Sequence, residues 1–182
     1  FDALFEGKAL RISEDFLHAY SEARAFGKAL ARRGKGSGFM KNLMEQRICS
    51  SVHAGLETAR RLLQGGAVPE QDEEIDGEVK IETSDERDVL LRLIDRLERL
   101  DADPKMEAVV HYLESEKWLP LGVIIFSQYY DTAKWMADAL AARYPDEAVG
   151  LYAGAGRSRL YQRGDSVSVE RETLKKMVAE HQ

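Results

Sequence analysis

Two short polar segments of this sequence carry the residue types best suited to bind an anion. The first contains Ser127, Gln128 and Tyr129, and Thr132 follows shortly after them. Hydroxyl and amide groups can donate hydrogen bonds to a phosphate oxygen, and the free N–H groups of a following helix would point to the same place. The alternative is an ordinary strand-to-helix turn in which Asp131 or Thr132 caps the helix. The spacing of these residues leaves both interpretations open.

The second segment contains Gly154, Gly156, Arg157 and Ser158. Glycines allow backbone N–H groups to approach an anion closely, and an arginine adds charge and a fork of hydrogen-bond donors. Glycines and arginines are also common in surface loops, so an ordinary loop is the alternative. The segment gains weight from its expected position beside the first one.

The elements around these segments predict that the two would meet. The apolar, β-branched run at 123–126 is typical of a strand that is buried on both faces of a parallel sheet. Asp131 then opens an amphipathic helix, and a second short apolar run follows at 149–152. Each polar segment thus follows a predicted strand, and ligands of open α/β sheets bind at the carboxyl ends of the strands. We therefore expect an α/β fold with a parallel sheet.

The sequence at 1–66 predicts a helical hairpin. One helix would begin at the N-cap Ser13 and end near Gly34, and a second would run over 39–63. Cys49 lies in the second helix and is interpreted as a small buried residue. The basic residues of the hairpin could line a nucleic-acid groove by attracting phosphates, or could form a solvated helix face. They are Arg24, Lys28, Arg32, Arg33, Lys35 and Lys41.

The segment that follows differs in composition, since six of the nine residues at 70–78 are acidic. We interpret 67–84 as an acidic linker or loop. A helix is expected over 85–100, and its leucine stripe favours packing onto the rest of the domain, with a coiled-coil partner as the alternative. The remaining domain spans 85–182, and its second helix is expected to start after Asp103, where a proline takes the first helical position.

Composition limits the classes of function. The chain has 182 residues and a formal net charge of −6, so its bulk charge does not indicate nucleic-acid binding. Its one cysteine excludes an internal disulfide and favours a reducing, cytoplasmic location. No apolar run is long enough to cross a bilayer, and the histidines form no metal-ligand cluster. The chain also lacks a phosphate loop and an acidic pair after an apolar strand, so it has no visible means of hydrolysing a nucleotide.

Taken in order, several motifs resemble one family, the superfamily-two helicases of the Swi/Snf-like type. The sequence at 123–133 is similar to the family motif I-I-F-[ST]-x-[YF]-x-x-T-A of the second RecA-like lobe. The sequence at 169–174 is similar to the helix opening E-R-x-x-L that follows it. The segment at 103–106 matches the usual entry into this lobe, and 47–54 is similar to the R-x-x-S-S-x-x-A helix that links the two lobes. The resemblance covers residues 39–64 and 103–180.

The resemblance implies an ATP-dependent, nucleic-acid-stimulated DNA translocase, with ATP and Mg²⁺ as cofactors of the intact protein. This chain would be a piece of it that holds the interlobe helices and the first half of the second lobe. The fold would be a partial RecA-like parallel sheet with helices on both faces, preceded by the helical hairpin. The partners would be the phosphate backbone of nucleic acid, DNA in particular, and the first RecA-like lobe of the same protein. No membrane partner is expected.

The resemblance also implies which residues grip the nucleic acid. Those near the tracking strand would be Ser127, Gln128, Tyr129 and Thr132, and those of a second backbone clamp would be Gly154, Gly156, Arg157 and Ser158. The family's arginine-finger motif, Q-x-x-G-R-x-x-R, is not present. We therefore expect no catalytic residue, no metal ligand and no tight cofactor binding in this chain, and no activity of the chain alone.

Two other functions stay open. A non-catalytic interaction module would use the helix at 85–100 and the acidic linker to recruit a partner protein. A nucleotide- or phosphate-binding α/β enzyme of another class would bind ATP by itself, whereas the helicase-lobe interpretation predicts almost no ATP binding.

Overall fold

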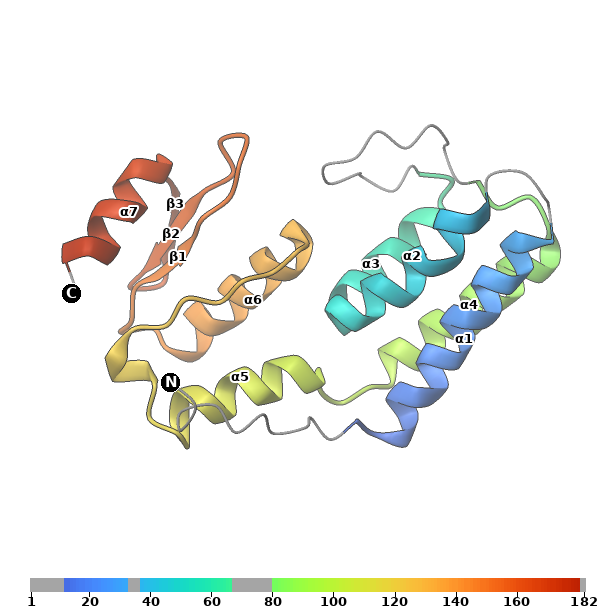
Figure 1. Cartoon of the computed structure of the whole chain (residues 1–182), viewed down its shortest axis with the longest axis horizontal. Coiled ribbons are helices and arrows are strands. Elements are labelled where there is room, and N and C mark those ends of the chain that lie inside the picture. The colour runs from blue at the N-terminus through green and yellow to red at the C-terminus, as the bar shows by residue number, and fades with distance from the viewer. Residues whose placement is uncertain (1–11, 33–36, 67–79, 181–182) are drawn as a thin grey trace. The chain divides into compact units, whose positions relative to one another are not determined.

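The computed structural model describes residues 12–32, 37–66 and 80–180. The chain divides into two compact units, Phe1–Leu119 and Pro120–Gln182. Within the described ranges it contains seven α-helices, a short 3₁₀ helix and one small sheet of three strands (Figure 1). The expectation of a protein that mixes helices and strands is confirmed, whereas a parallel sheet is not found in the described part of the chain.

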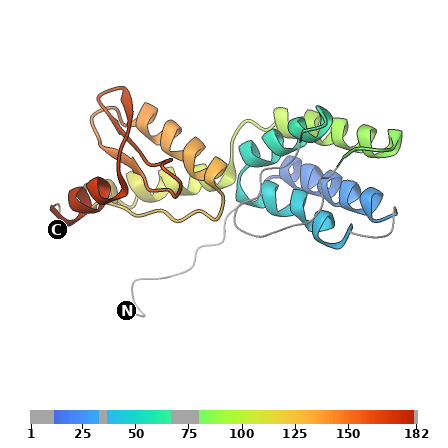
Figure 2. The ribbon, with the colours of Figure 1, turned by 90° about the horizontal axis from the view of Figure 1, so that it is seen from above.

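The first unit consists of helices within its described residues. α1 packs against α2 and α4, and α3 packs against the same two helices (Figure 1, Figure 2). The predicted acidic linker at 67–84 lies outside the described residues up to position 79. The bounds of the helices are α1 Glu14–Ala31, α2 Ser37–Ser50, α3 Val52–Leu63, α4 Ser84–Glu98 and α5 Pro104–Glu114.

Apolar residues from α1, α2, α3 and α4 form one buried core. Leu90, Leu93 and Leu97 of α4 belong to it, and each is at most 2% exposed. Phe26 of α1 and Met44 of α2 belong to the same cluster and are equally buried. The predicted leucine stripe therefore packs onto the rest of its own unit, as expected, and is not left free for a coiled-coil partner.

The prediction of a single helix over 39–63 is wrong, because the helix is interrupted at Ser51. This residue has an extended backbone, with φ −163° and ψ 155°, and its side chain accepts a hydrogen bond from the Ala54 N–H at 3.0 Å. Serine competes for helical N–H groups in this way, which ends α2 and caps α3. The two helices then pack so closely that a Cβ on Gly55 would lie 2.6 Å from Ile48 Cγ1.

One buried carboxylate joins the starts of two helices of the first unit. Oδ1 of Asp103 accepts hydrogen bonds from the N–H groups of Lys105 at 2.9 Å and Met106 at 3.2 Å, which confirms the predicted start of α5. Oδ2 accepts a hydrogen bond from the Val52 N–H, the first of α3, at 2.6 Å. Since helix starts leave N–H groups without partners, this one side chain, 8% exposed, caps α3 and α5 together.

Cys49 is exposed, so the prediction that it is a buried residue is wrong. It follows Ile48, which is 1% exposed, by one position, and successive helical residues point about 100° apart. The buried side of α2 is therefore taken by Met44 and Ile48, and Cys49 lies beside it. The protein around Cys49 still partly desolvates the thiol, and this burial raises its pKa.

The second unit combines a small sheet with two helices (Figure 1). The strands run in the order β1-β2-β3, and both pairings are antiparallel. Ala137 of α6, Leu151 of β1 and Tyr161 of β2 form its buried core, and Leu174 of α7 lies against Gly150, where a Cβ would be 3.2 Å from Leu174 Cδ2. The bounds are α6 Tyr130–Arg143, β1 Val149–Leu151, β2 Arg159–Gln162, β3 Asp165–Ser168 and α7 Arg171–Glu180, and a 3₁₀ turn, Leu119–Leu121, lies at the boundary of the units.

The predicted parallel sheet is corrected in two respects. The run at 123–126 forms no strand and is exposed, with values from 39% at Val123 to 91% at Phe126. The second predicted strand does form, as β1, but its partner is β2, which runs back from it. The described sheet is built from two local antiparallel pairings, and Arg163 and Gly164, with φ 54° and 83°, close the two-residue hairpin between β2 and β3.

Replacing Asp103 by alanine removes the acceptor of three backbone N–H groups at once. Since a lost cap typically costs about 0.5–2 kcal/mol, we expect the free energy of unfolding to fall by about 2–3 kcal/mol. Urea unfolding followed by circular dichroism measures the change. Asp101→Ala is the matched control, because Asp101 is exposed and should shift stability by less than about 0.5 kcal/mol. Equal stability of the two variants would contradict the double-cap role.

Candidate nucleic-acid interface

The loop at 152–158 is closed at its neck by one serine. Ser158 Oγ donates a hydrogen bond to the Ala153 carbonyl at 2.9 Å and accepts one from the Ala153 N–H at 3.0 Å. The Ser158 carbonyl in turn accepts a hydrogen bond from the Val169 N–H at 3.1 Å. Ser158 is 1% exposed, so its hydroxyl serves the loop and is not presented to a ligand.

The tip of this loop is held in a left-handed turn. Ala155 and Gly156 have φ values of 55° and 68°, and the Arg157 N–H donates to the Gly154 carbonyl at 3.1 Å. Positive φ angles favour glycine, which explains Gly156. Ala155 adopts the same left-handed conformation although it has a side chain. Gly154, Ala155, Gly156 and Arg157 are all exposed. The tip therefore presents backbone and one guanidinium to solvent.

Arg157 connects the two segments that the sequence singles out. The carbon of its guanidinium lies 4.2 Å from the centre of the Tyr130 ring, within the range of a cation–π contact. Tyr130 is the first residue of α6 and directly follows the first polar segment. The structure thus brings the second segment beside the end of the first, as the sequence predicts.

The first segment is arranged more as a turn than as a row of free donors. Ser127 Oγ accepts a hydrogen bond from the Tyr129 N–H at 3.3 Å and donates one to the Tyr129 carbonyl at 3.1 Å. Tyr129 and Thr132 are buried, at 9% and 3% exposure, and Gln128 is exposed. The N-cap of α6 is Tyr129 and makes no side-chain cap hydrogen bond, so the expected capping by Asp131 or Thr132 is not found.

The eight predicted contact residues therefore separate into two groups. Five are exposed, and a ligand can reach them: Ser127, Gln128, Gly154, Gly156 and Arg157. Three are buried: Tyr129, Thr132 and Ser158. Their binding roles stay predictions.

A second aromatic–arginine pair lies at the loop, and the sequence motifs did not indicate it. The Arg171 guanidinium carbon lies 4.8 Å from the centre of the Tyr152 ring, and Tyr152 is 48% exposed. A local charge count would have drawn attention to it. The sequence at 152–176 contains six basic and three acidic residues, although the whole chain has a net charge of −6.

The basic residues of the predicted hairpin give less support to a nucleic-acid groove. Arg32 Nη1 lies 2.8 Å from Asp85 Oδ2, so its charge is already paired. Arg33 and Lys35 lie outside the described residues, as does the side chain of Lys41. The ion pair of Arg32 favours a solvated helix face there.

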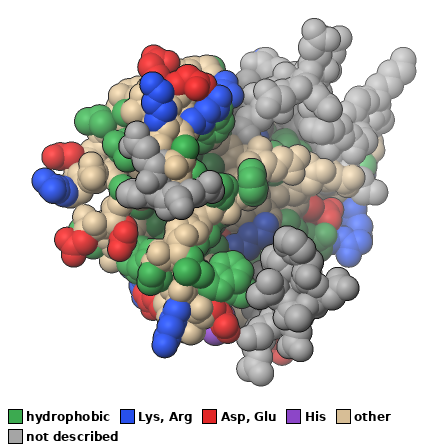
Figure 3. All heavy atoms as spheres, turned by 60° about the vertical axis from the view of Figure 1, so that its left-hand side comes forward, with side chains coloured by type: hydrophobic (Ala, Val, Ile, Leu, Met, Phe, Trp, Pro, Cys, Tyr) green, Lys and Arg blue, Asp and Glu red, His purple; other side chains and the backbone are tan. Residues whose placement is uncertain are grey.

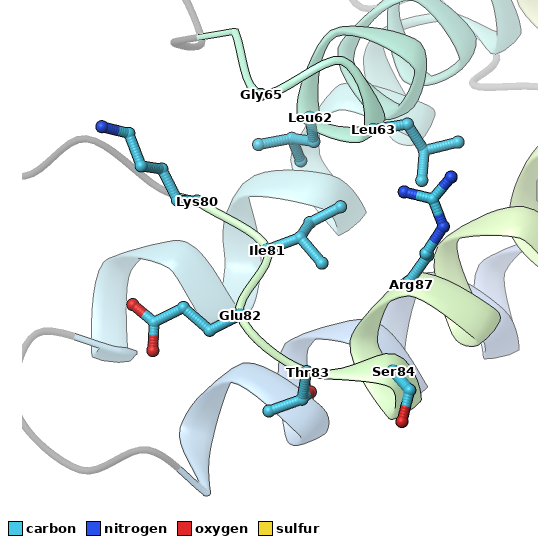
Figure 4. Close-up of a pocket in the computed structure, with 9 residues that line it drawn as sticks. All are labelled: Leu62, Leu63, Gly65, Lys80, Ile81, Glu82, Thr83, Ser84 and Arg87. Carbon is cyan, nitrogen blue, oxygen red and sulfur yellow. The ribbon is translucent and has the colours of Figure 1, made fainter.

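A hollow of about 400 Å³ lies in the first unit, and none of the eight predicted residues lines it. Figure 4 shows the side chains that line it, which come from the end of α3, the start of α4 and the segment just before α4. Lys80 and Arg87 give it positive charge, and Leu62 and Ile81 make part of its wall apolar. The start of α4 is already capped, since the Thr83 side chain accepts a hydrogen bond from the Glu86 N–H and the buried Glu86 side chain accepts one from the Glu82 N–H.

Comparison of the chain with protein-family models, curated proteins and solved structures gives no match. Among residues 12–32, 37–66 and 80–180, no group of three or more histidine, cysteine or acidic side chains is arranged to hold a metal ion. No helix in the same ranges is both long and apolar enough to cross a membrane. The resemblance to helicases thus depends on the residues of this chain alone.

Tyr161 carries a buried hydroxyl in the core of the second unit. Burial, with a smaller contribution from the nearby Asp138 carboxylate, raises its pKa to about 12. The hydroxyl makes no hydrogen bond of ordinary geometry to the described residues, and Asp138 is instead bonded to Lys134 at 2.6 Å. Both the closeness of the Asp138 carboxylate to the hydroxyl and its negative charge add to the effect of burial on the pKa of Tyr161.

Replacing Ser158 by alanine should open the neck of the loop. The variant loses both hydrogen bonds to Ala153, so we expect a loss of stability of about 1–3 kcal/mol and faster exchange of the Ala153 amide hydrogen. Hydrogen exchange followed by NMR measures the second effect. Ser168→Ala, at an exposed position of β3, is the control and should leave the Ala153 amide protected. Unchanged protection in Ser158→Ala would show that the neck does not depend on this serine.

The buried hydroxyl of Tyr161 predicts a titration at unusually high pH. The neutral phenol is favoured in the folded protein, so its contribution to stability is present below pH 10 and is lost as the pH rises through about 12. One of the seven tyrosines should therefore ionise late in an ultraviolet absorbance titration of the native chain. That component should vanish in Tyr161→Phe and remain in Tyr152→Phe. An unaltered curve for Tyr161→Phe would contradict the assignment.

Proposed function

We propose that this chain is part of an ATP-dependent, nucleic-acid-stimulated DNA translocase, in which it supplies the backbone-gripping part of the second motor lobe. The observation that carries the proposal is Arg157, which is held over the Tyr130 ring at the tip of an exposed glycine loop. The neck of that loop is fixed by Ser158. A guanidinium on a fixed loop is well suited to bind a phosphate.

The stacking on Tyr130 explains why Arg157 suits this task. A free arginine side chain loses conformational entropy when it binds, and a contact that already restricts it reduces this loss. The stacked guanidinium also keeps its N–H groups at the edge of the plane, where they can reach two phosphate oxygens. Contacts of this kind bind the backbone and not the bases, so binding would be insensitive to sequence and would depend steeply on salt.

A larger, RecA-like parallel sheet is part of the proposal. The apolar run at 123–126 is exposed, and β1 pairs with β2 on one edge only within the described sheet. An exposed apolar run and an open strand edge are features that proteins normally cover. In the complete lobe the run would become a strand of that sheet, with helices on both faces.

ATP and Mg²⁺ belong to the intact motor in this proposal, and no tight binding of either to this chain is expected. The described residues offer no group of three acidic, histidine or cysteine side chains that fits a metal ion. The first RecA-like lobe would supply those groups and would be the partner of this one. The chain by itself is expected to be inactive and to act as a clamp, in the cytoplasm and away from membranes.

The interaction-module alternative has less support from the packing. It requires the helix at 85–100 to offer its leucine stripe to a partner protein, but Leu90, Leu93 and Leu97 are buried in the core of the first unit. A separate nucleotide-binding enzyme would bind ATP by itself, and the sequence lacks the phosphate loop that many such enzymes use. The clamp is therefore the function we propose.

Replacing Arg157 by alanine should weaken the binding of duplex DNA without unfolding the chain. A lost charge-assisted contact predicts an affinity about tenfold lower and a salt dependence shallower by about 0.9 in the log–log slope. Fluorescence anisotropy over a series of salt concentrations measures both, and circular dichroism checks the fold. Arg163→Ala, at the turn of the β2–β3 hairpin, is the matched control. DNA affinity that is the same in wild type and Arg157→Ala would refute the clamp.

A further inference from the structure

We propose that Arg171, held by Tyr152, is a second phosphate-binding residue, so that the loop at 152–158 grips two phosphates of one strand. This inference rests on the proposed function and deepens it. Neither residue belongs to the eight that the sequence suggests. The pair is identified by its geometry, its exposure and the way its backbone is tied to the loop.

The Arg171 pair repeats the construction of the Arg157 pair. Each has a guanidinium stacked on a tyrosine ring, at 4.2 Å for Arg157 on Tyr130 and at 4.8 Å for Arg171 on Tyr152. Both arginines are exposed, and Tyr152 is half-exposed. In both pairs the ring restricts the guanidinium, while the N–H groups at its edge stay open to a ligand.

Hydrogen bonds around Ser158 tie together the chain segments that carry the two arginines. The Ser158 side chain makes two hydrogen bonds to the backbone of Ala153. Arg157 directly precedes Ser158, and Tyr152 directly precedes Ala153. The Val169 N–H bonds to the Ser158 carbonyl, and Arg171 lies two residues further on. These three hydrogen bonds therefore link the backbone segments that carry the two arginines.

Other charges near the loop bear on whether these two arginines can bind a phosphate. Arg159 donates a hydrogen bond from Nε to Ser166 Oγ at 2.9 Å and lies along the hairpin. Acidic residues flank Arg171 on both sides: Glu172 is paired with Lys175 at 2.6 Å, which offsets its repulsion of a phosphate, and Glu170 is exposed. Since six of the nine charged residues at 152–176 are basic, this part of an acidic chain favours an anion.

Two independent phosphate contacts predict additive effects on salt dependence. Each neutralised phosphate contributes about 0.9 to the slope of log affinity against log salt on duplex DNA. We expect Arg171→Ala to make this slope shallower by about 0.9, as is expected for Arg157→Ala. The double variant should make it shallower by about twice that amount. Each single variant should also lose roughly tenfold in affinity, and the losses should multiply because the contacts are separate.

The role of Tyr152 requires its own variants, because the ring positions a charge without carrying one. Tyr152→Leu should lower the affinity severalfold and leave the salt slope close to that of wild type. Tyr152→Phe retains the aromatic face and should bind as wild type does. Arg163→Ala again serves as the control for loss of a nearby charge, and thermal unfolding shows that each variant is folded. If Arg171→Ala does not fold, Arg171→Gln, which keeps most of the side chain, takes its place.

Fluorescence anisotropy with a short duplex at several salt concentrations separates the possible results. A slope lowered by both Arg157→Ala and Arg171→Ala supports two contacts. A slope lowered by Arg157→Ala alone overturns the role of Arg171 and leaves the proposed clamp intact. Equal binding by Tyr152→Leu and Tyr152→Phe overturns the positioning role of the ring. The proposed function itself is refuted if the wild-type chain does not bind the duplex. It is also refuted if the wild-type chain and both arginine variants bind with the same salt dependence.

Discussion

The candidate interface depends on the hydrogen bonds of one buried serine. Ser158 joins the residue after β1 to the start of β2 through Ala153, and it joins β2 to the segment before α7 through Val169. A buried hydroxyl that both donates and accepts satisfies its own polar groups and those of the backbone around it. The exposed tip can therefore be rich in glycine without being loose, because its neck is fixed from inside.

The first unit uses the same device at a different place. Asp103 supplies the acceptors that the starts of α3 and α5 lack, and Ser51 ends α2 so that α3 can begin at a new angle. Both side chains are buried where the chain leaves regular structure. Breaks between elements are where backbone N–H groups lose their partners, so single polar side chains have their largest effect there. Apolar packing forms the core of each unit, and these polar residues determine how its elements connect.

The sequence predicts those parts of the fold that depend on local chemistry. Periodic apolar residues and N-caps such as Ser13 and Asp103 correctly indicate α1, α4 and α5, because these signals act within one turn of helix. The run at 123–126 misleads, since a β-branched segment becomes a strand only beside another strand. Among the site residues, the exposure of Arg157 agrees with expectation, whereas Ser158 lies inside. A periodic pattern cannot reveal this, because a serine hydroxyl suits a ligand and a loop neck equally well.

The exposed run at 123–126 and the stacked arginines are explained together by the proposed clamp. Side chains such as Phe126, at 91% exposure, contribute no hydrophobic stabilisation while they face water, and burial of apolar area is worth about 25 cal/mol per Å². A sheet that extends past β1 would recover this term and would set the polar segment after 126 at its edge. The arginines need no such change, because each is already held by a tyrosine. In the proposed clamp the gripping surface would thus be formed within the second unit, and the sheet that supports it would extend past the strands described.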